Sequence, residues 1–227
     1  MTKRTIAWTL SVIMLLSVLA NVSFHAVAAE TQHNHSNAHS CSEQCADGTI
    51  TWTAWGSNSF PTTSGHYYLT KDITLPARIT VAAGKDITIC LNGYDMTVAS
   101  GATGSTYIQG KLIISDCTAY YDGETYVSGA VSGSKSDNGG LMNVRAGGAF
   151  VLEGGKLTGN TATASGGAIS IQGSTAAVVH VYGGEITGNY AKKDDGTLRS
   201  GAGIVVNNGG NLVHARNTPY GHASVVV

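Results

Sequence analysis

One phrase, written twice between residues 147 and 206, constrains the fold of this chain more than any other feature. Residues 154–160 read Gly-Gly-Lys-Leu-Thr-Gly-Asn, and residues 183–189, 29 positions later, read Gly-Gly-Glu-Ile-Thr-Gly-Asn. A repeat of fixed period that joins short apolar segments with glycine corners is typical of a solenoid, because one unit cannot bury its apolar face until a neighbour stacks on it. We therefore expect each repeat to form one coil of a stack.

Alignment of the two copies predicts which side chains stack. The expected pairs are apolar in both copies: Phe150 with Val179, Leu152 with Val181, Leu157 with Ile186, Ile169 with Ile204, and Ile171 with Val206. Val151 and His180 fall between these positions, which gives the period of two of a strand with one face inside, so we expect His180 to face outward. Asn160 and Asn189 are expected to form a ladder of stacked amides.

The rest of the chain also favours an all-β fold. Thirty glycines, only three prolines and 12% charged residues are typical neither of a helical bundle nor of a charged disordered chain. Looser copies at residues 79–98 and 107–118 extend the stack backwards, and a degraded third copy follows residue 208. We expect surface loops at residues 119–126 and at the Gly- and Ser-rich residues 129–138.

The sequence ends in the apolar strand 225–227. An apolar strand edge that nothing covers invites pairing with another chain. We expect self-association through this C-terminal coil.

Residues 1–29 have the pattern of a signal peptide. Lys3 and Arg4 precede an apolar run at residues 6–20 and a small-residue end at residues 26–29. An uncleaved membrane anchor is the alternative, although the run is shorter than the roughly 20 residues of a spanning helix. Removal of the peptide leaves 11 basic and 14 acidic residues, a formal charge of −3, which argues against a nucleic-acid partner.

Residues 30–50 are expected to form a flexible leader. The leader contains His33, His35, His39, Cys41 and Cys45. These residue types are zinc ligands, whereas an exported chain tends to oxidise its thiols. A zinc site, a disulfide between Cys41 and Cys45, thiols without a bond, and no role at all remain open.

An aromatic cluster begins the mature domain, which we expect to span residues 51–227. Its members lie within residues 51–75: Trp52, Trp55, Phe60, Tyr67 and Tyr68. Exposed aromatic rings can stack on sugars, but we favour a cap over the open end of the apolar core.

Cys90 and Cys117 occupy near-equivalent places in the two looser copies, 27 residues apart. Successive coils are expected to bring them close together. A disulfide between them and a pair of stacked buried thiols are both compatible with this placement, because stacking does not guarantee the geometry that a disulfide requires.

Three motifs resemble those of a known group of proteins. Residues 183–191 (GGEITGNYA), 90–93 (CLNG) and 114–117 (ISDC) resemble the right-handed parallel β-helix repeat proteins found as adhesin-like surface proteins of gut bacteria, and are similar to the repeats of chlamydial polymorphic outer-membrane proteins. The resemblance, over roughly residues 67–227, implies a pectin-lyase-like solenoid that is secreted or held at the bacterial cell surface. Members are usually longer, so we expect the stack to be truncated at its C-terminal end.

An insertion at residues 192–200 interrupts the repeat. It holds the charged residues of our candidate binding loop: Lys192, Lys193, Asp194, Asp195 and Arg199. With Gly221-His222, the Asp194-Asp195 pair faintly resembles the paired Asp and the Gly-His of polygalacturonases, which implies acid and base catalysis. That family's preceding Asn-x-Asp and later Arg-x-Lys are absent. Asp194 and Asp195 are therefore the candidate catalytic residues of a second hypothesis.

Our leading hypothesis is a secreted or cell-surface, adhesin-like β-helix module without catalytic activity that binds carbohydrate or a host surface protein. The alternative is a polysaccharide lyase or glycoside hydrolase of the pectin-lyase-like fold. The sequence shows no nucleophile elbow, phosphate loop or two-pair zinc motif, so we expect no cofactor.

Overall fold

The computed structural model describes residues 51–225 except 105, 174–176, 208–209 and 215–222. The predicted signal peptide and leader, with the candidate zinc ligands and the Cys41–Cys45 pair, lie outside the described residues. Within the described part of the chain, no helix is long and apolar enough to cross a membrane.

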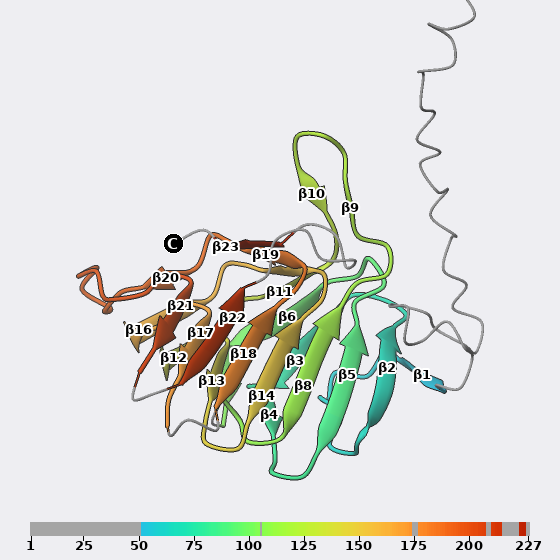
Figure 1. The fold of residues 1–227 in the computed structure, drawn as a ribbon, viewed down its shortest axis with the longest axis horizontal. Helices are drawn as coiled ribbons and strands as arrows, with labels where there is room; N and C mark the ends of the chain where they lie inside the picture. The colour runs from blue at the N-terminus through green and yellow to red at the C-terminus, as the bar shows by residue number, and fades with distance from the viewer. Residues whose placement is uncertain (1–50, 105, 174–176, 208–209, 215–222, 226–227) are drawn as a thin grey trace, which may run out of the picture. The chain divides into compact units, whose positions relative to one another are not determined.

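Three parallel sheets run along the stack, and a fourth, sheet 3, is present from β12 onward; the chain visits the sheets in the same order from coil to coil (Figure 1). Sheet 1 contains β1 (Trp52–Trp55), β2 (Gly65–Leu69), β5 (Asp86–Cys90), β8 (Lys111–Ser115), β14 (Ala149–Leu152), β18 (Val178–Val181) and β22 (Asn211–His214). Sheet 2 contains β3 (Ile73–Ala77), β6 (Met96–Thr103), β11 (Ala130–Ser132), β15 (Lys156–Leu157), β19 (Gly184–Ile186) and β23 (Ala223–Val225). Sheet 3 contains β12 (Lys135–Asn138), β16 (Thr161–Ser165) and β20 (Tyr190–Ala191). Sheet 4 contains β4 (Thr80–Val81), β7 (Tyr107–Ile108), β13 (Met142–Val144), β17 (Ile169–Ile171) and β21 (Ile204–Val206).

Successive coils pair in parallel and in register. In sheet 1, Phe150 of β14 lies between Leu112 of β8 and Val179 of β18. All five side-chain pairs predicted from the repeat are strand partners in the structure. The predicted fold class, an all-β parallel β-helix, is confirmed.

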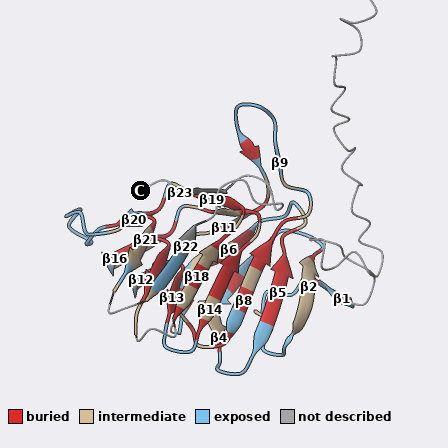
Figure 2. Ribbon diagram, viewed as in Figure 1, coloured by how far each residue is buried: buried red, intermediate tan, exposed pale blue. Residues whose placement is uncertain are grey.

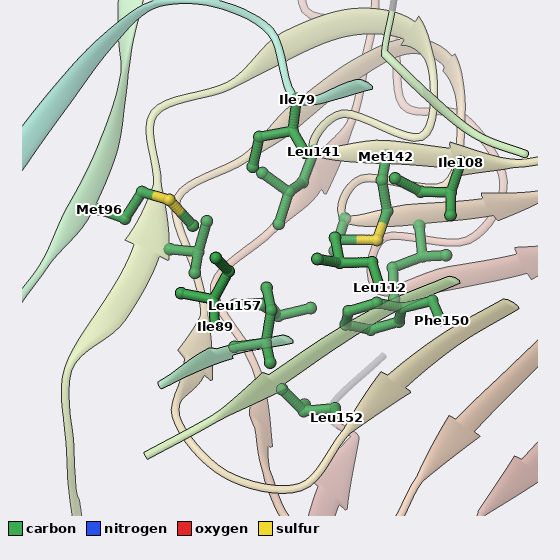
Figure 3. Close-up of a cluster of buried hydrophobic side chains, with 14 of the residues drawn as sticks. Ile79, Ile89, Met96, Ile108, Leu112, Leu141, Met142, Phe150, Leu152 and Leu157 are labelled. Atoms are coloured by element: carbon green, nitrogen blue, oxygen red, sulfur yellow. The ribbon is translucent and has the colours of Figure 1, made fainter. Parts of the chain in front are cut away.

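The core lies inside the coils, where the inward-facing side chains of the sheets meet (Figures 2 and 3). The large side chains that are 0% exposed include Ile89, Leu112, Phe150 and Leu152 from sheet 1, Met96 and Leu157 from sheet 2, and Ile108 and Met142 from sheet 4. Each layer of the core is apolar at the same positions as the layer next to it. Every added coil therefore removes the apolar face of the previous coil from water.

The outer face of sheet 1 is less exposed than the alternation predicts. His180 is half-buried, and Val151 is only 8% exposed. Val151 pairs with Ile113 on one side and with His180 on the other. Its low exposure agrees with this placement, because strands in a sheet lie close enough for large side chains to shield a smaller one between them.

Asn160 and Asn189 form the predicted amide ladder inside the turn between sheets 2 and 3. The Asn160 Nδ2 group donates to Asn189 Oδ1 (2.9 Å) and to the carbonyl oxygen of Val131 (3.2 Å). Asn160 Oδ1 accepts from the backbone N–H of Ser134 (3.1 Å), and Asn189 Nδ2 donates to the carbonyl oxygen of Leu157 (2.8 Å). Each buried amide thus joins its own coil to a neighbouring coil at a corner where the strand ladders are interrupted.

Close approach between coils explains the glycines before sheet 4. A Cβ atom added at Gly167 would lie 2.0 Å from the carbonyl oxygen of Ala202 in the next coil. Gly140 stands in the same relation to Gly167, with its added Cβ 2.0 Å from the Gly167 oxygen. Only glycine fits where two backbones come this close.

The predictions of surface loops at residues 119–126 and 129–138 are wrong in part. Residues 129–138 contain β11 and β12, and Val131 is fully buried. Residues 119–126 contain β9 (Tyr120–Tyr121) and the first residue of β10 (Tyr126–Val127). The Gly and Ser content favours a loop, but β11 has strand partners on both sides, and this tertiary pairing outweighs local propensity.

The N-terminal aromatic residues pack at the first end of the described stack. β1 pairs in parallel with β2, and the Trp55 ring meets Phe60 edge to face at 5.9 Å. The Trp52 ring meets His66 in a similar way at 5.2 Å. Trp55 belongs to the apolar core. These contacts support a cap at residues 51–75, whose limits stay a prediction.

The amide ladder gives a test of the stack. Asn160→Asp places a carboxylate opposite the carbonyl oxygen of Val131 and Asn189 Oδ1, so we expect the free energy of unfolding in urea to fall by at least about 3 kcal/mol at pH 7. The loss should shrink as the pH falls towards about 4, because burial beside two acceptor oxygens raises the pKa of the new carboxyl and the protonated form regains a donor. Asn207→Asp, the same change at a half-buried position, should cost less than about 0.5 kcal/mol. Equal losses at both sites would contradict the ladder's role.

Candidate functional site

A two-stranded hairpin projects from the stack between sheets 1 and 2 (Figure 1). It comprises residues 119–128, and we call it the tyrosine hairpin. Its strands β9 and β10 are antiparallel, with Tyr120 opposite Val127 and Tyr121 opposite Tyr126. The hairpin is inserted between β8 and β11. The corresponding connections from sheet 1 to sheet 2 in the neighbouring coils, β5 to β6 and β14 to β15, have no such insertion.

The tyrosine hairpin exposes aromatic and apolar side chains. Tyr120 is 50% exposed, Tyr121 52% and Val127 37%. Directly opposed residues of an antiparallel pair share one face, so Tyr120 and Val127 form a single exposed apolar face. Figure 2 shows most of this projection as exposed. Apolar surface that no core covers is a common mark of a binding site.

Tyr126 anchors the hairpin to the next coil. Its side chain is 5% exposed, and its hydroxyl oxygen accepts a hydrogen bond from the backbone N–H of Gly155 (3.2 Å). Burial raises the pKa of Tyr126 to about 12, so the phenol is neutral at physiological pH. The Lys156 Nζ lies 5.9 Å from the centre of its ring. One tyrosine of the hairpin is therefore structural, and two are presented to solvent.

The Asp116 carboxylate fixes the base of the hairpin. Asp116 is 8% exposed, and its Oδ1 accepts from Gly93 N (3.1 Å), Thr118 N (3.0 Å) and Thr118 Oγ1 (2.8 Å). Its Oδ2 accepts from Gly129 N at 2.6 Å. Thr118 precedes the hairpin and Gly129 follows it. A single buried carboxylate thus holds the two ends of the insertion together and ties them to the preceding coil.

Asp122 organises the tip. Its carboxylate accepts from the backbone N–H groups of Thr125 (2.8 Å) and Glu124 (2.9 Å), and from Thr125 Oγ1 (2.9 Å). These bonds, led by the Thr125 backbone, hold the pKa of Asp122 below its usual value. The tip is consequently a closed turn at neutral pH, and the exposed tyrosines stand on an ordered support.

The predicted binding loop at residues 192–200 is a second hairpin, between sheets 3 and 4. Lys192 and Leu198 form an antiparallel bridge, and Arg199 N donates to the carbonyl oxygen of Ala191 (2.7 Å). Leu198 is 77% exposed and the neighbouring Tyr190 is 52% exposed. The Lys192 Nζ lies 5.2 Å from the centre of the Tyr190 ring.

Both aspartates of this second hairpin have polar partners. Asp194 Oδ1 lies 2.6 Å from Lys135 Nζ. Asp195 Oδ1 accepts from Thr197 N (2.9 Å), and hydrogen bonds from Thr197, followed by the nearby charge of Arg199, lower the pKa of Asp195. A general acid needs a raised pKa. The arrangement around Asp195 therefore favours a structural role, in which the carboxylate closes a turn, and not the role of an acid catalyst.

Glu153 is the described carboxyl group whose environment is closest to that of an acid catalyst. It is half-buried, and desolvation raises its pKa, although the charge of Lys111 acts in the opposite direction. Glu153 follows β14 of sheet 1, whereas Asp194 and Asp195 lie between sheets 3 and 4. The fold does not join them into one acid and base pair. The Gly221-His222 part of the polygalacturonase-like pattern lies outside the described residues.

Two thiols and a carboxylate meet beside the base of the tyrosine hairpin. The Sγ atoms of Cys90 and Cys117 are 3.4 Å apart, and both lie within 4.8 Å of an Asp116 carboxylate oxygen. Sulfur and carboxylate ligands can hold a metal ion. Asp116, however, already accepts the four hydrogen bonds that fix the hairpin base.

The described part of the chain defines a class of protein: a parallel β-helix in which two hairpins project from corners of the stack. Comparison with protein-family models, with curated protein sequences and with solved structures finds no significant match.

The two exposed tyrosines of the first hairpin were missed by sequence reasoning, which treated residues 119–126 as a loop. A signal for the hairpin was present, because Asp122-Gly123 follows Tyr-Tyr and precedes Glu-Thr-Tyr-Val, and Asp-Gly between β-favouring segments is a strong hairpin pattern.

Replacement of the Asp116 carboxylate tests its role at the hairpin base. Asp116→Asn puts an amide where two acceptor oxygens are needed, so we expect a loss of about 2–3 kcal/mol in unfolding free energy. The substitution should increase the exchange rates of the amide hydrogens of residues 119–128 more than those of sheet 1. The matched variant Asp122→Asn should affect exchange only at the tip. Unchanged exchange at both ends of the hairpin in Asp116→Asn would contradict the assignment.

Proposed function

We propose that this protein is a secreted or cell-surface, adhesin-like β-helix module that binds carbohydrate through the tyrosine hairpin and has no catalytic activity. The observation that carries the proposal is the pair of half-exposed rings, Tyr120 and Tyr121, on an insertion that is fixed at its base and closed at its tip. An ordered support lowers the entropy lost when the rings contact a ligand.

The chemistry of the hairpin supports a sugar as the ligand. Tyrosine combines a flat apolar ring with a hydroxyl group, which suits the apolar faces and hydroxyls of a sugar. The exposed side chain of Glu124 lies in the turn next to Tyr121, and carboxylates accept hydrogen bonds from hydroxyl groups. A host surface protein is the other ligand class expected from the sequence, and the experiments below distinguish it.

Export rests on the pattern of residues 1–29, and adhesin-like character on the three sequence motifs. The mature charge of −3 is consistent with a partner other than nucleic acid. The second hairpin, with Leu198 and Tyr190 exposed, is a secondary contact surface in this proposal.

The binding test uses matched tyrosines. Adjacent strand residues point to opposite faces, so Tyr120→Ala or Tyr121→Ala, whichever removes the ring on the binding face, should weaken binding to the best glycan from an array at least about tenfold, since a central aromatic contact contributes more than about 1.4 kcal/mol. Tyr190→Ala removes an equally exposed tyrosine beside the other hairpin and should change affinity less than about twofold. Affinity would be measured by titration calorimetry on folded protein.

Three results would contradict the proposal. Loss of binding in Tyr190→Ala alone would place the site on the second hairpin. Binding to host surface proteins but to no glycan would show that the ligand is a protein and not a carbohydrate. Binding that survives all three substitutions would remove both hairpins from the site.

The catalytic alternative has its own test. Incubation with pectin, polygalacturonate and host glycans should release neither new reducing ends nor unsaturated products. Asp195→Asn should leave that result unchanged, because the carboxylate closes a turn. Product formation that Asp195→Asn abolishes would establish the enzyme and overturn the non-catalytic proposal.

A further inference from the structure

The cysteine pair beside the tyrosine hairpin has no part in the proposed binding function. Cys90 is the last residue of β5, and its register partner on β8 is Ser115, so Cys117 lies two residues beyond the equivalent position. The sulfurs still meet, because the chain leaves sheet 1 in a turn in which Ala119 N donates to the Asp116 carbonyl oxygen. We propose that Cys90 and Cys117 form a reversible disulfide that joins the coil of β5 to the coil of β8.

The two sulfur atoms are close to bonding distance. The two Sγ atoms are 3.4 Å apart, and a disulfide bond requires them to close by about 1.4 Å. The backbone N–H of Cys117 also lies 3.4 Å from Cys90 Sγ. The contact therefore joins two chain segments that already touch, 27 residues apart in sequence.

A metal ion fits this position less well than a bond between the sulfurs. The third ligand would be Asp116, whose two oxygens accept four hydrogen bonds from Gly93, Thr118 and Gly129. Coordination of a metal would compete with these bonds and release the hairpin base. A disulfide leaves every one of them in place.

The two thiols differ in access, which sets the order of the reaction. Cys117 is half-buried, whereas Cys90 is 0% exposed. With a low-molecular-weight disulfide such as oxidised glutathione as oxidant, the Cys117 thiolate attacks one glutathione sulfur and releases one reduced glutathione. The Cys90 thiolate then attacks the Cys117 sulfur of the mixed disulfide and releases the second. Two protein thiols are oxidised and one glutathione disulfide is reduced, so atoms and electrons balance.

The bond would act on the support of the tyrosine hairpin. Cys117 lies between Asp116, which holds the hairpin base, and Thr118, which precedes β9. Oxidation would fix this corner to the end of β5. The inference concerns the cross-link itself and stands whether or not the hairpin binds carbohydrate.

The experiment uses the full chain with Cys41→Ser and Cys45→Ser, so that only the proposed pair remains. Incubation of the folded protein with oxidised glutathione should lower its intact mass by two hydrogen atoms and yield a cross-linked Cys90–Cys117 peptide on non-reducing digestion. The melting temperature should rise by roughly 5–10 °C, and dithiothreitol should reverse the change.

Single variants in the same background test the reaction order. Cys90→Ser should retain one glutathione on Cys117, because no second thiol displaces it. Cys117→Ser should take up none while folded, because Cys90 is buried. Full alkylation of both thiols after oxidation would overturn the proposal, and so would stoichiometric zinc binding that blocks oxidation. Equal glutathione uptake by the two single variants would overturn the proposed order.

Discussion

Hydrogen bonding between coils in parallel register is the interaction on which the rest of this structure depends. It places each apolar side chain over an apolar side chain of the next coil, as Leu112, Phe150 and Val179 show in sheet 1. It also brings backbone so close to backbone at the corners that glycine is required, as at Gly167. Where the strand ladders are interrupted, the buried amides of Asn160 and Asn189 continue the same contact from coil to coil.

Stacking restricts which residues the strands of such a fold can contain. Insertions at the corners do not have to stack, so their residues are less restricted. Residues 119–128 and 192–199 leave the stack as hairpins, and both carry exposed aromatic or apolar side chains. The two differ in how their polar groups are used. In the second hairpin, Asp194, Asp195 and Lys192 contact Lys135, Thr197 and the Tyr190 ring, whereas the first is held from below by Asp116 and presents two tyrosines. This contrast is why the tyrosine hairpin is the better candidate site.

The corner between Cys90 and Gly129 concentrates the polar chemistry of the described chain. A buried carboxylate, two sulfurs and the anchored phenol of Tyr126 lie at the foot of one projecting element. Burial makes each of them sensitive to substitution, since a buried polar group without its partner costs free energy. The same polar groups therefore affect both the stability of the protein and the position of the hairpin. Neither the repeat nor the apolar core requires these groups.

The sequence by itself determined the coil: the period, the five stacked apolar pairs and the Asn160–Asn189 ladder follow from two aligned copies, because a solenoid converts equal spacing into contact. Only the tertiary structure decided the rest. Residues 129–138 became strands because neighbouring coils supplied partners, against their local Gly and Ser content. Tyr120 and Tyr121 became exposed, and Cys117 reached Cys90 two residues out of register, because both depend on how the chain turns after Asp116. A repeat pattern carries no information about the segments that depart from it, so their side chains could be placed only by the fold.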